Sequence, residues 1–169
     1  GWQLDPNYDV PVYFTKSYGE DLGVRIADVN GDGLEDLISS NYSMTTGKVY
    51  INQGNGTGWS LDSNYEVPTD FVGEYNDDLG VRIADVNGDG LPDLLRSTYN
   101  FTGVYLNKGD GMGWADPLNY YIPVKFTEPG SALADVNGDG LIDILFAKKN
   151  SYQATYINNG NGWNDDDVK

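Results

Sequence analysis

The sequence predicts an all-β fold made of three tandem repeats, each with four short antiparallel strands. Three observations support this prediction. Gly-Trp recurs at Trp2, Trp59, Trp114 and Trp163, with spacings of 57, 55 and 49 residues. The apolar runs between these pairs are short, rich in Val, Ile, Tyr and Phe, and bounded by Gly, Asn, Asp and Pro, which favours strands and tight turns. One acidic nine-residue segment occurs in each repeat.

The elements follow the same order in each repeat. A Tyr-rich segment after Gly-Trp is followed by the acidic segment, then by a Tyr/Ile/Leu run that ends in Asn, then by a Gly/Asn-rich turn. In the middle repeat we expect strands at Val81–Ala84, Leu94–Ser97, Val104–Asn107 and roughly Tyr65–Phe71. Because Pro68 lacks an amide donor, the Tyr65–Phe71 strand is expected at the outer edge of its sheet.

Four strands in roughly 50 residues are the pattern of a β-propeller blade. Propellers usually have about four to eight blades, so three repeats leave the outer strand Tyr8–Phe14 without a blade of its own. We expect another copy, or flanking sequence, to supply its partner, and the resulting assembly to be a closed ring or a filament. The expected organisation is a single repeat domain, 1–169, with repeats at approximately 2–58, 59–113 and 114–163 and an acidic tail at 164–169.

The composition excludes several functional classes. Ten Lys and Arg against 26 Asp and Glu give a formal charge of −16, which disfavours nucleic acid and anionic membrane partners and attracts cations. The chain has no Cys and no His, so zinc and soft-metal sites, disulfides and imidazole catalysis are not expected. No apolar stretch approaches the roughly 20 residues of a membrane span. Since the chain starts at Gly1 without a signal peptide, we expect a mature product or part of a longer protein.

The acidic segments read Asp-Val-Asn-Gly-Asp-Gly-Leu-x-Asp at Asp28–Asp36, Asp85–Asp93 and Asp135–Asp143. Calcium takes about six to eight oxygen ligands, and the glycine at position 6 suits a sharp turn with positive φ. We expect one Ca²⁺ per loop, bound by side chains at positions 1, 3, 5 and 9, with position 9 bidentate, and by the carbonyl of position 7. The expected ligands are Asp28, Asn30, Asp32, Leu34 and Asp36; Asp85, Asn87, Asp89, Leu91 and Asp93; and Asp135, Asn137, Asp139, Leu141 and Asp143.

Two other interpretations share part of this pattern. A helical EF-hand loop requires an acidic ligand at position 12, but that position holds Ser39, Arg96 and Phe146, and strand-like runs follow. A simple turn would also explain Asn-Gly-Asp-Gly in one copy. Three copies with acids at positions 1, 5 and 9 favour calcium over a simple turn.

The whole chain resembles the FG-GAP/VCBS repeats of integrin-like β-propellers, through Ala84–Leu95 and its two counterparts. The following run, Val104–Trp114, is similar to the bacterial form found in large secreted and toxin-associated proteins. The resemblance implies blades of four antiparallel strands with calcium in the loop between the first two, at the positions named above. Leu22-Gly23 and Leu79-Gly80 stand where integrin repeats have an aromatic-Gly pair, so integrin-like ligand binding is not implied.

Other recurring features have more than one interpretation. The four Trp residues fit a sugar-stacking platform, but residues repeating in register favour packing between blades. Sequons at Asn41, Asn55 and Asn100 lie in predicted turns and are candidate N-glycosylation sites. The run 164–167 is interpreted as a solvated tail, with a further calcium contact as the alternative.

The leading functional hypothesis is a non-enzymatic, secreted or cell-surface calcium-binding repeat module that self-assembles by sharing strands between copies. A recognition propeller that binds glycan or protein is the first alternative. A glycosidase is the second, and it is disfavoured because the acidic pairs Glu20-Asp21 and Asp77-Asp78 have no match in the third repeat. Free calcium is high outside cells, which favours the extracellular location.

Overall fold

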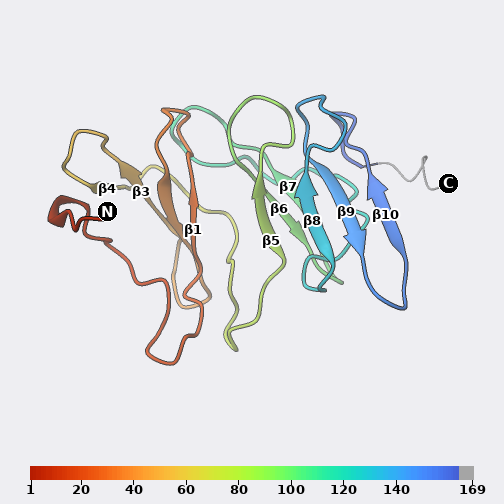
Figure 1. Cartoon of the computed structure of the whole chain (residues 1–169), viewed down its shortest axis with the longest axis horizontal. Helices are drawn as coiled ribbons and strands as arrows, with labels where there is room; N and C mark the ends of the chain where they lie inside the picture. Colours follow the sequence, from red (N-terminus) through yellow and green to blue (C-terminus); the bar gives the residue numbers. More distant parts are fainter. Residues whose placement is uncertain (164–169) are drawn as a thin grey trace. The chain divides into compact units, whose positions relative to one another are not determined.

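The computed structural model describes residues 1–163 of the 169-residue chain, and the described part is all-β (Figure 1). Its ten strands form three antiparallel sheets, which confirms the predicted all-β class. The sheets have four, three and three strands, whereas the sequence predicts four strands in each. The chain divides into two compact units. Unit 1 comprises Gly1–Asp77 with Lys108–Gly113, and unit 2 comprises Asp78–Asn107 with the residues from Trp114 onward. None of the described residues forms a helix with the length and apolar character that crossing a bilayer requires.

Unit 1 holds a four-stranded sheet in sequential order, formed by β1 (Val24–Ala27), β2 (Asp36–Ser39), β3 (Lys48–Asn52) and β4 (Trp59–Asp62). The central strand β2 is buried along its whole length, as expected for a strand covered on both faces. The chain enters this unit through a short 3₁₀ turn, η1 (Pro6–Tyr8).

Unit 2 holds two three-stranded sheets. The first consists of β5 (Val81–Ala84), β6 (Asp93–Ser97) and β7 (Thr102–Tyr105), and the second of β8 (Ser131–Ala134), β9 (Asp143–Ala147) and β10 (Gln153–Tyr156). Their shared core is apolar. It contains Val86, Leu95, Val104, Ile122, Val124, Phe126, Ile144, Phe146, Tyr156 and Trp163.

In the middle repeat, the predicted strands Val81–Ala84 and Leu94–Ser97 are confirmed as β5 and as part of β6. The third strand, β7, begins and ends two residues before the predicted Val104–Asn107, and the predicted outer strand Tyr65–Phe71 is wrong. The fourth strand of the first sheet is β4, which starts at Trp59 and pairs with β3 from Asn52↔Trp59 to Val49↔Asp62. Isolated bridges Asn107↔Trp114 and Val104↔Leu118 place residues 114–118 beside β7 in the same way.

The turn before Trp59 explains why β4, and not Tyr65–Phe71, is the fourth strand of the first sheet. The Gly/Asn-rich turn closes a hairpin from the third strand to the fourth, with the Gln53 amide donating to the Gly58 carbonyl at 2.9 Å. Gly58 has φ of 78°, in the left-handed region that such turns favour. In the first sheet, Trp59 therefore begins the outer strand β4.

The segments expected as outer strands are instead extended connectors, residues 65–72 and 120–127. In unit 1, Tyr65, Val67, Phe71 and Val72 are buried against the first sheet. In unit 2, Ile122, Val124 and Phe126 are buried in the shared core. These connectors contribute apolar burial and a few single hydrogen bonds, without a strand ladder.

Candidate metal centre

The three acidic loops join the first and second strands of their sheets, as predicted. They follow β1, β5 and β8 and lead into β2, β6 and β9, at the same end of each sheet (Figure 1). In each case the last loop residue, position 9, is the first residue of the second strand. The glycines at position 6, Gly33, Gly90 and Gly140, have φ of 86°, 86° and 88°, which confirms the expected sharp turn.

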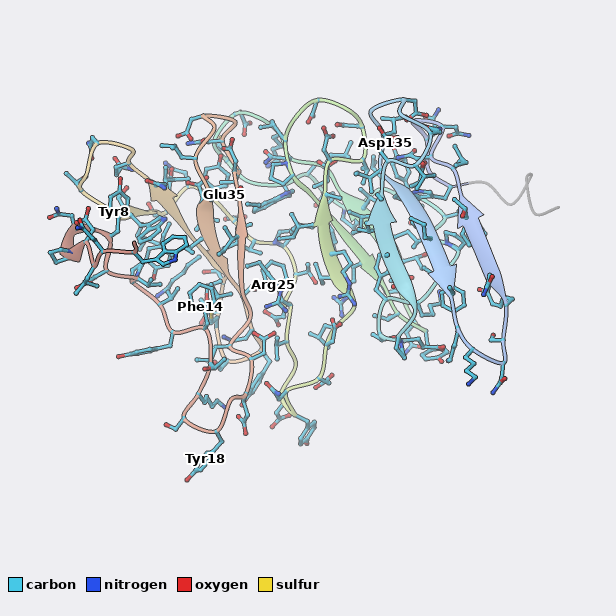
Figure 2. The ribbon with its side chains drawn as sticks, in the orientation of Figure 1. Tyr8, Phe14, Tyr18, Arg25, Glu35 and Asp135 are labelled. Atoms are coloured by element: carbon cyan, nitrogen blue, oxygen red, sulfur yellow. The ribbon has the colours of Figure 1, made fainter. Side chains whose placement is uncertain are left out.

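The carboxylate at position 1 lies inside the curl of its loop. In the first loop, Asp28 accepts from the amides of Gly31 at 2.8 Å and Gly33 at 2.7 Å. The equivalent distances are 2.8 and 2.7 Å around Asp85, and 2.7 and 2.9 Å around Asp135, which lies just beyond β8 in Figure 2. The two glycine amides hold the pKa of Asp135 below its ordinary value. A carboxylate in this setting stays ionised.

The side chains at positions 3 and 5 lie side by side at the loop tip. The side-chain nitrogen of Asn30 donates to Asp32 Oδ2 at 2.9 Å. The other carboxylate oxygen of Asp32 accepts from the backbone amide of Leu34 at 2.9 Å. The same two bonds recur in the second and third loops, at 2.8–2.9 Å. We call positions 1, 3 and 5 the loop tip. The tip thus gathers three oxygen-bearing side chains on one curled backbone in each repeat.

The predicted carbonyl ligands at position 7 belong to half-buried leucines. Leu34, Leu91 and Leu141 are intermediate in exposure. Their side chains cover the surface of the turns without joining the fully buried core.

The carboxylate at position 9, which we call the loop base, is fully buried in all three loops. Asp36 Oδ2 accepts from the Val29 amide at 3.0 Å, and Oδ1 accepts from the Asn52 amide at 2.7 Å. Asp93 and Asp143 make the same pair of bonds at 2.7–3.0 Å. The loop base therefore ties the start of its loop to the end of the third strand.

Burial raises the pKa of Asp36 and of Asp93 to about 6, although two backbone amides favour the charged form of each carboxyl. The neighbouring Asp32 and Asp28 carboxylates raise the pKa of Asp36 further, and Asp89 and Asp85 act in the same way on Asp93. Tip and base carboxylates are thus close enough to repel each other.

The predicted ligands are only partly brought together. Among residues 1–163, no three acidic side chains converge closely enough to hold a metal ion. Positions 1, 3 and 5 share the tip, whereas both oxygens of position 9 face backbone amides of the base. The sequence pattern predicted the side chains at positions 1, 3, 5 and 9 around one ion, but it did not predict that position 9 lies at the base, separate from the tip.

Sequence reasoning missed two residues that support the loop base. An Asn at the end of the third strand or two residues beyond it donates from its side-chain nitrogen to the carbonyl of position 8, at 3.3 Å from Asn52, 3.5 Å from Asn107 and 3.3 Å from Asn158. The recurring Trp donates to that carbonyl, at 2.9 Å from Trp114 and 3.0 Å from Trp163. The signal was visible in the sequence, because both residues recur in register with the loops.

The tryptophans do not form one platform. Trp114 and Trp163 are buried, which favours packing over a sugar-stacking platform for these two. Trp59 is half-buried, with the Tyr8 ring against it edge-on at 5.5 Å, and its indole nitrogen is 3.5 Å from the Glu35 carbonyl oxygen. Trp2 is fully exposed.

The three sequons differ in accessibility. Asn41 is half-buried, and its side-chain nitrogen donates to the Leu22 carbonyl at 2.9 Å. Asn55 and Asn100 are exposed. The 164–167 run lies outside the described residues. Asn55 and Asn100 are thus the accessible candidates for modification.

Several solved structures share the fold. One is a lectin from Agrocybe aegerita, in a study of specific recognition of non-reducing terminal N-acetylglucosamine. It matches with a TM-score of 0.60 and 20% identity over 83% of this chain and 36% of the lectin. Another is the Photorhabdus luminescens Tc holotoxin pore, with a TM-score of 0.62 and 24% identity over 92% of this chain and 7% of the toxin chain. This chain therefore spans about a third of the lectin chain and less than a tenth of the toxin chain.

Sequence comparison identifies the family of this chain. No individual curated protein matches the chain. The model of the FG-GAP-like repeat matches residues 28–96 and, in a second copy, residues 85–146. These matches cover the acidic loops and the strands around them, over more than half of the sequence. The chain therefore belongs to the FG-GAP-like repeat family.

Proposed function

We propose that the chain is a non-enzymatic calcium-binding repeat module whose three sheets are blades of a β-propeller, with one Ca²⁺ at each acidic loop. The observation that carries this proposal is the loop tip. Positions 1, 3 and 5 repeat the same curled arrangement in every loop, with two carboxylates and one amide oxygen. Oxygen donors of this kind suit a hard cation.

The donor set fits calcium better than other metals. The chain has no Cys or His, so it lacks the ligands of zinc and soft metals. Asp28, Asn30 and Asp32 would hold the ion in the first loop, with the equivalent residues in the other two. A bound cation supplies positive charge, which offsets the repulsion between the tip and the buried Asp36 carboxylate.

Calorimetric titration tests the metal proposal. Calcium added to the metal-free chain should bind with a stoichiometry of three. A variant with Asp32→Ala, Asp89→Ala and Asp139→Ala should lose this binding while keeping its far-UV spectrum. Unchanged binding by the folded triple variant would contradict the proposal.

We propose an extracellular location and association between copies as the setting of this module. Three calcium ions would offset six of the sixteen net negative charges, which reduces repulsion between copies. Free calcium is high outside cells and low in cytosol, so structural sites of this kind suit secretion. Sedimentation at rising concentration, with calcium and then with chelator, tests the association. Multimers should form with calcium and dissociate without it, whereas a monomer under both conditions would contradict the association.

Recognition of a glycan or protein is a second candidate function, favoured by exposed tyrosines in loops opposite the acidic loops. Tyr18, Tyr75 and Tyr99 are 95%, 86% and 74% exposed, and Tyr18 projects away from its loop in Figure 2. Tyrosines offer rigid contact area with a polar tip. The Agrocybe lectin with the same fold is described as recognising N-acetylglucosamine. Glycan-array binding that is lost in Tyr18→Ser and Tyr75→Ser variants would support recognition, and its absence would count against a glycan ligand.

A further inference from the structure

The two connectors show how a sheet of this protein receives the segment that follows it. In unit 1, the Phe71 amide donates to the Ser40 carbonyl at 3.2 Å, and Tyr65 Oη donates to the Val29 carbonyl at 3.2 Å. Ser40 Oγ also donates to Asp70 Oδ1 at 3.1 Å. This contact buries Val29 and Ser40 almost completely.

The connector in unit 2 repeats this contact on the second sheet. The Phe126 amide donates to the Ser97 carbonyl at 3.1 Å, and Ser97 Oγ donates to the Val124 carbonyl at 2.6 Å. An arginine from the first strand covers the Phe ring in both units, at 5.6 Å between Arg25 and Phe71 and at 5.5 Å in the second unit. Two independent copies therefore define one mode of docking.

The N-terminal segment has the same sequence pattern as these connectors but remains open. Tyr8, Val10, Pro11 and Phe14 align with Tyr65, Val67, Pro68 and Phe71. Val10 and Phe14 are 49% and 41% exposed, whereas Val67 and Phe71 are 8% and 1% exposed. The N-terminal segment thus presents a connector face that no described residue covers to the same extent.

The third sheet presents the complementary face. Val136 and Ala147 occupy the positions of Val29 and Ser40 in the first sheet. Val136 is 46% exposed, against 0% for Val29. Ala147 is exposed, against 1% for Ser40. The described residues therefore leave uncovered the surface that receives a connector on the other two sheets.

We propose that residues 8–14 of one copy dock on the third sheet of a second copy, in the mode that the two internal connectors define. This inference rests on the association proposed above and identifies the contact. The Phe14 amide donates to the Ala147 carbonyl, and Val10 and Phe14 lose their exposure. The contact is heterologous, so it builds rings or open chains of copies.

The third sheet lacks the polar part of this contact. Ala132 and Ala147 replace the arginine and serine that the first two sheets provide. Without the guanidinium and the hydroxyl, the contact between copies consists of apolar surface and backbone bonds. It is therefore weaker than the internal contacts and reversible.

Substitutions on both faces test the contact by sedimentation in calcium. Val10→Asp should weaken association about tenfold or more, because it charges a side chain that becomes buried. The double variant Ala132→Arg with Ala147→Ser should strengthen it, since it restores the guanidinium and the hydroxyl of the first two sheets. Glu128, which pairs with Lys148 at 2.9 Å, stands at the place of the Asp21 and Asp78 carboxylates that pair with the natural arginines. Tyr75→Ser, an exposed aromatic outside both faces, is the matched control.

Cysteine pairing locates the contact directly, because the natural chain has no cysteine. Tyr13 and Ala147 occupy the positions of Asp70 and Ser40, whose side chains touch in unit 1. A mixture of Tyr13→Cys and Ala147→Cys variants should form a mixed disulfide, and a mixture of Tyr75→Cys and Ala147→Cys should not.

The outcomes separate this inference from the association on which it rests. A natural chain that stays monomeric in calcium would overturn both. Association that Val10→Asp leaves unchanged, with no mixed disulfide at residues 13 and 147, would overturn the proposed contact alone. Loss of association in Val10→Asp together with the specific disulfide would support the contact.

Discussion

The tip and the base of each acidic loop both contain aspartates, but the position-5 aspartate of the tip is exposed and the aspartate of the base is buried. At the tip, Asp32 is exposed and bonds to a loop amide and to a neighbouring side chain. At the base, Asp36 is fully buried and accepts from two backbone amides that are far apart in the sequence. The difference indicates that the base fixes the fold of the loop, whereas the tip is the exposed part, where the proposed ion would bind.

Among single substitutions in the metal-free chain, the largest effect should come from removing a carboxylate at the base. Asp93→Ala leaves the buried amides of Val86 and Asn107 without their acceptor, so it should lower the free energy of unfolding by about 2–4 kcal/mol. Urea unfolding in chelator measures this change. The matched tip variant Asp89→Ala should stay within about 0.5 kcal/mol of the natural chain, because its side chain is exposed. Equal losses in the two variants would break the distinction between tip and base.

In calcium, the tip carboxylates should also contribute to the free energy of unfolding. At about 100 times the dissociation constant, each occupied site should add about 2.7 kcal/mol to the free energy of unfolding. The variant Asp32→Ala, Asp89→Ala, Asp139→Ala should gain little, since its tips lack a ligand. Thermal unfolding with and without calcium gives both values. An equal gain in natural and variant chains would show that the ion binds elsewhere.

The base should also make the metal-free chain sensitive to pH. The pKa of Asp36 and Asp93 is about 6 when folded, against an ordinary value of 3.8. Protonation of these buried groups therefore stabilises the fold fully below about pH 4, and this stabilisation is lost as the pH rises through about 6. The expected size is about 1–3 kcal/mol per group, at about 1.4 kcal/mol per pKa unit. Urea unfolding in chelator at several pH values measures it.

The control for this pH dependence is the pair Asp36→Asn and Asp93→Asn. The general repulsion among the other acidic groups persists in this variant, so only the contribution of the two base carboxyls should disappear. A pH profile that the double variant leaves unaltered would assign the effect to the surface charge instead.

A smaller effect than that of the base carboxylates should come from the tryptophans that support the base. Trp114→Phe removes the bond from the indole nitrogen to the Pro92 carbonyl and some buried volume, at a cost of about 1–2 kcal/mol. Trp59→Phe should cost less, since its nitrogen is 3.5 Å from the Glu35 carbonyl oxygen and its ring is half-buried. Chemical unfolding of both variants compares them. A larger loss at Trp59 would reverse the expected order.

The sequence predicted the all-β class, the three repeats and the strand pair around each loop, because these depend on local patterns. It failed at the fourth strand. Tyr65–Phe71 has the alternation of a strand, but its amides find single partners such as the Ser40 carbonyl, while the tight turn before Trp59 commits β3 to pair with β4. Pairing depends on which chain segments meet, and a pattern within one segment does not specify this.

The candidate site was predictable to a similar degree. The repeated Asp, Asn and Gly correctly predicted a loop between the first and second strands of each sheet, with a sharp turn at position 6. They could not distinguish the base from the tip, because the environment of Asp36 depends on the amide of Asn52, sixteen positions along the chain. The aspartates of the tip and of the base are the same residue type in the sequence, and only their burial in the structure distinguishes them.

The most direct test of this account is a count of bound ions per chain by native mass spectrometry. The natural chain in calcium should show up to three added Ca²⁺ ions, and each single tip variant, Asp32→Ala, Asp89→Ala or Asp139→Ala, should show one fewer. Three ions in every tip variant, or none in the natural chain at saturating calcium, would contradict the claim that the loop tips bind calcium.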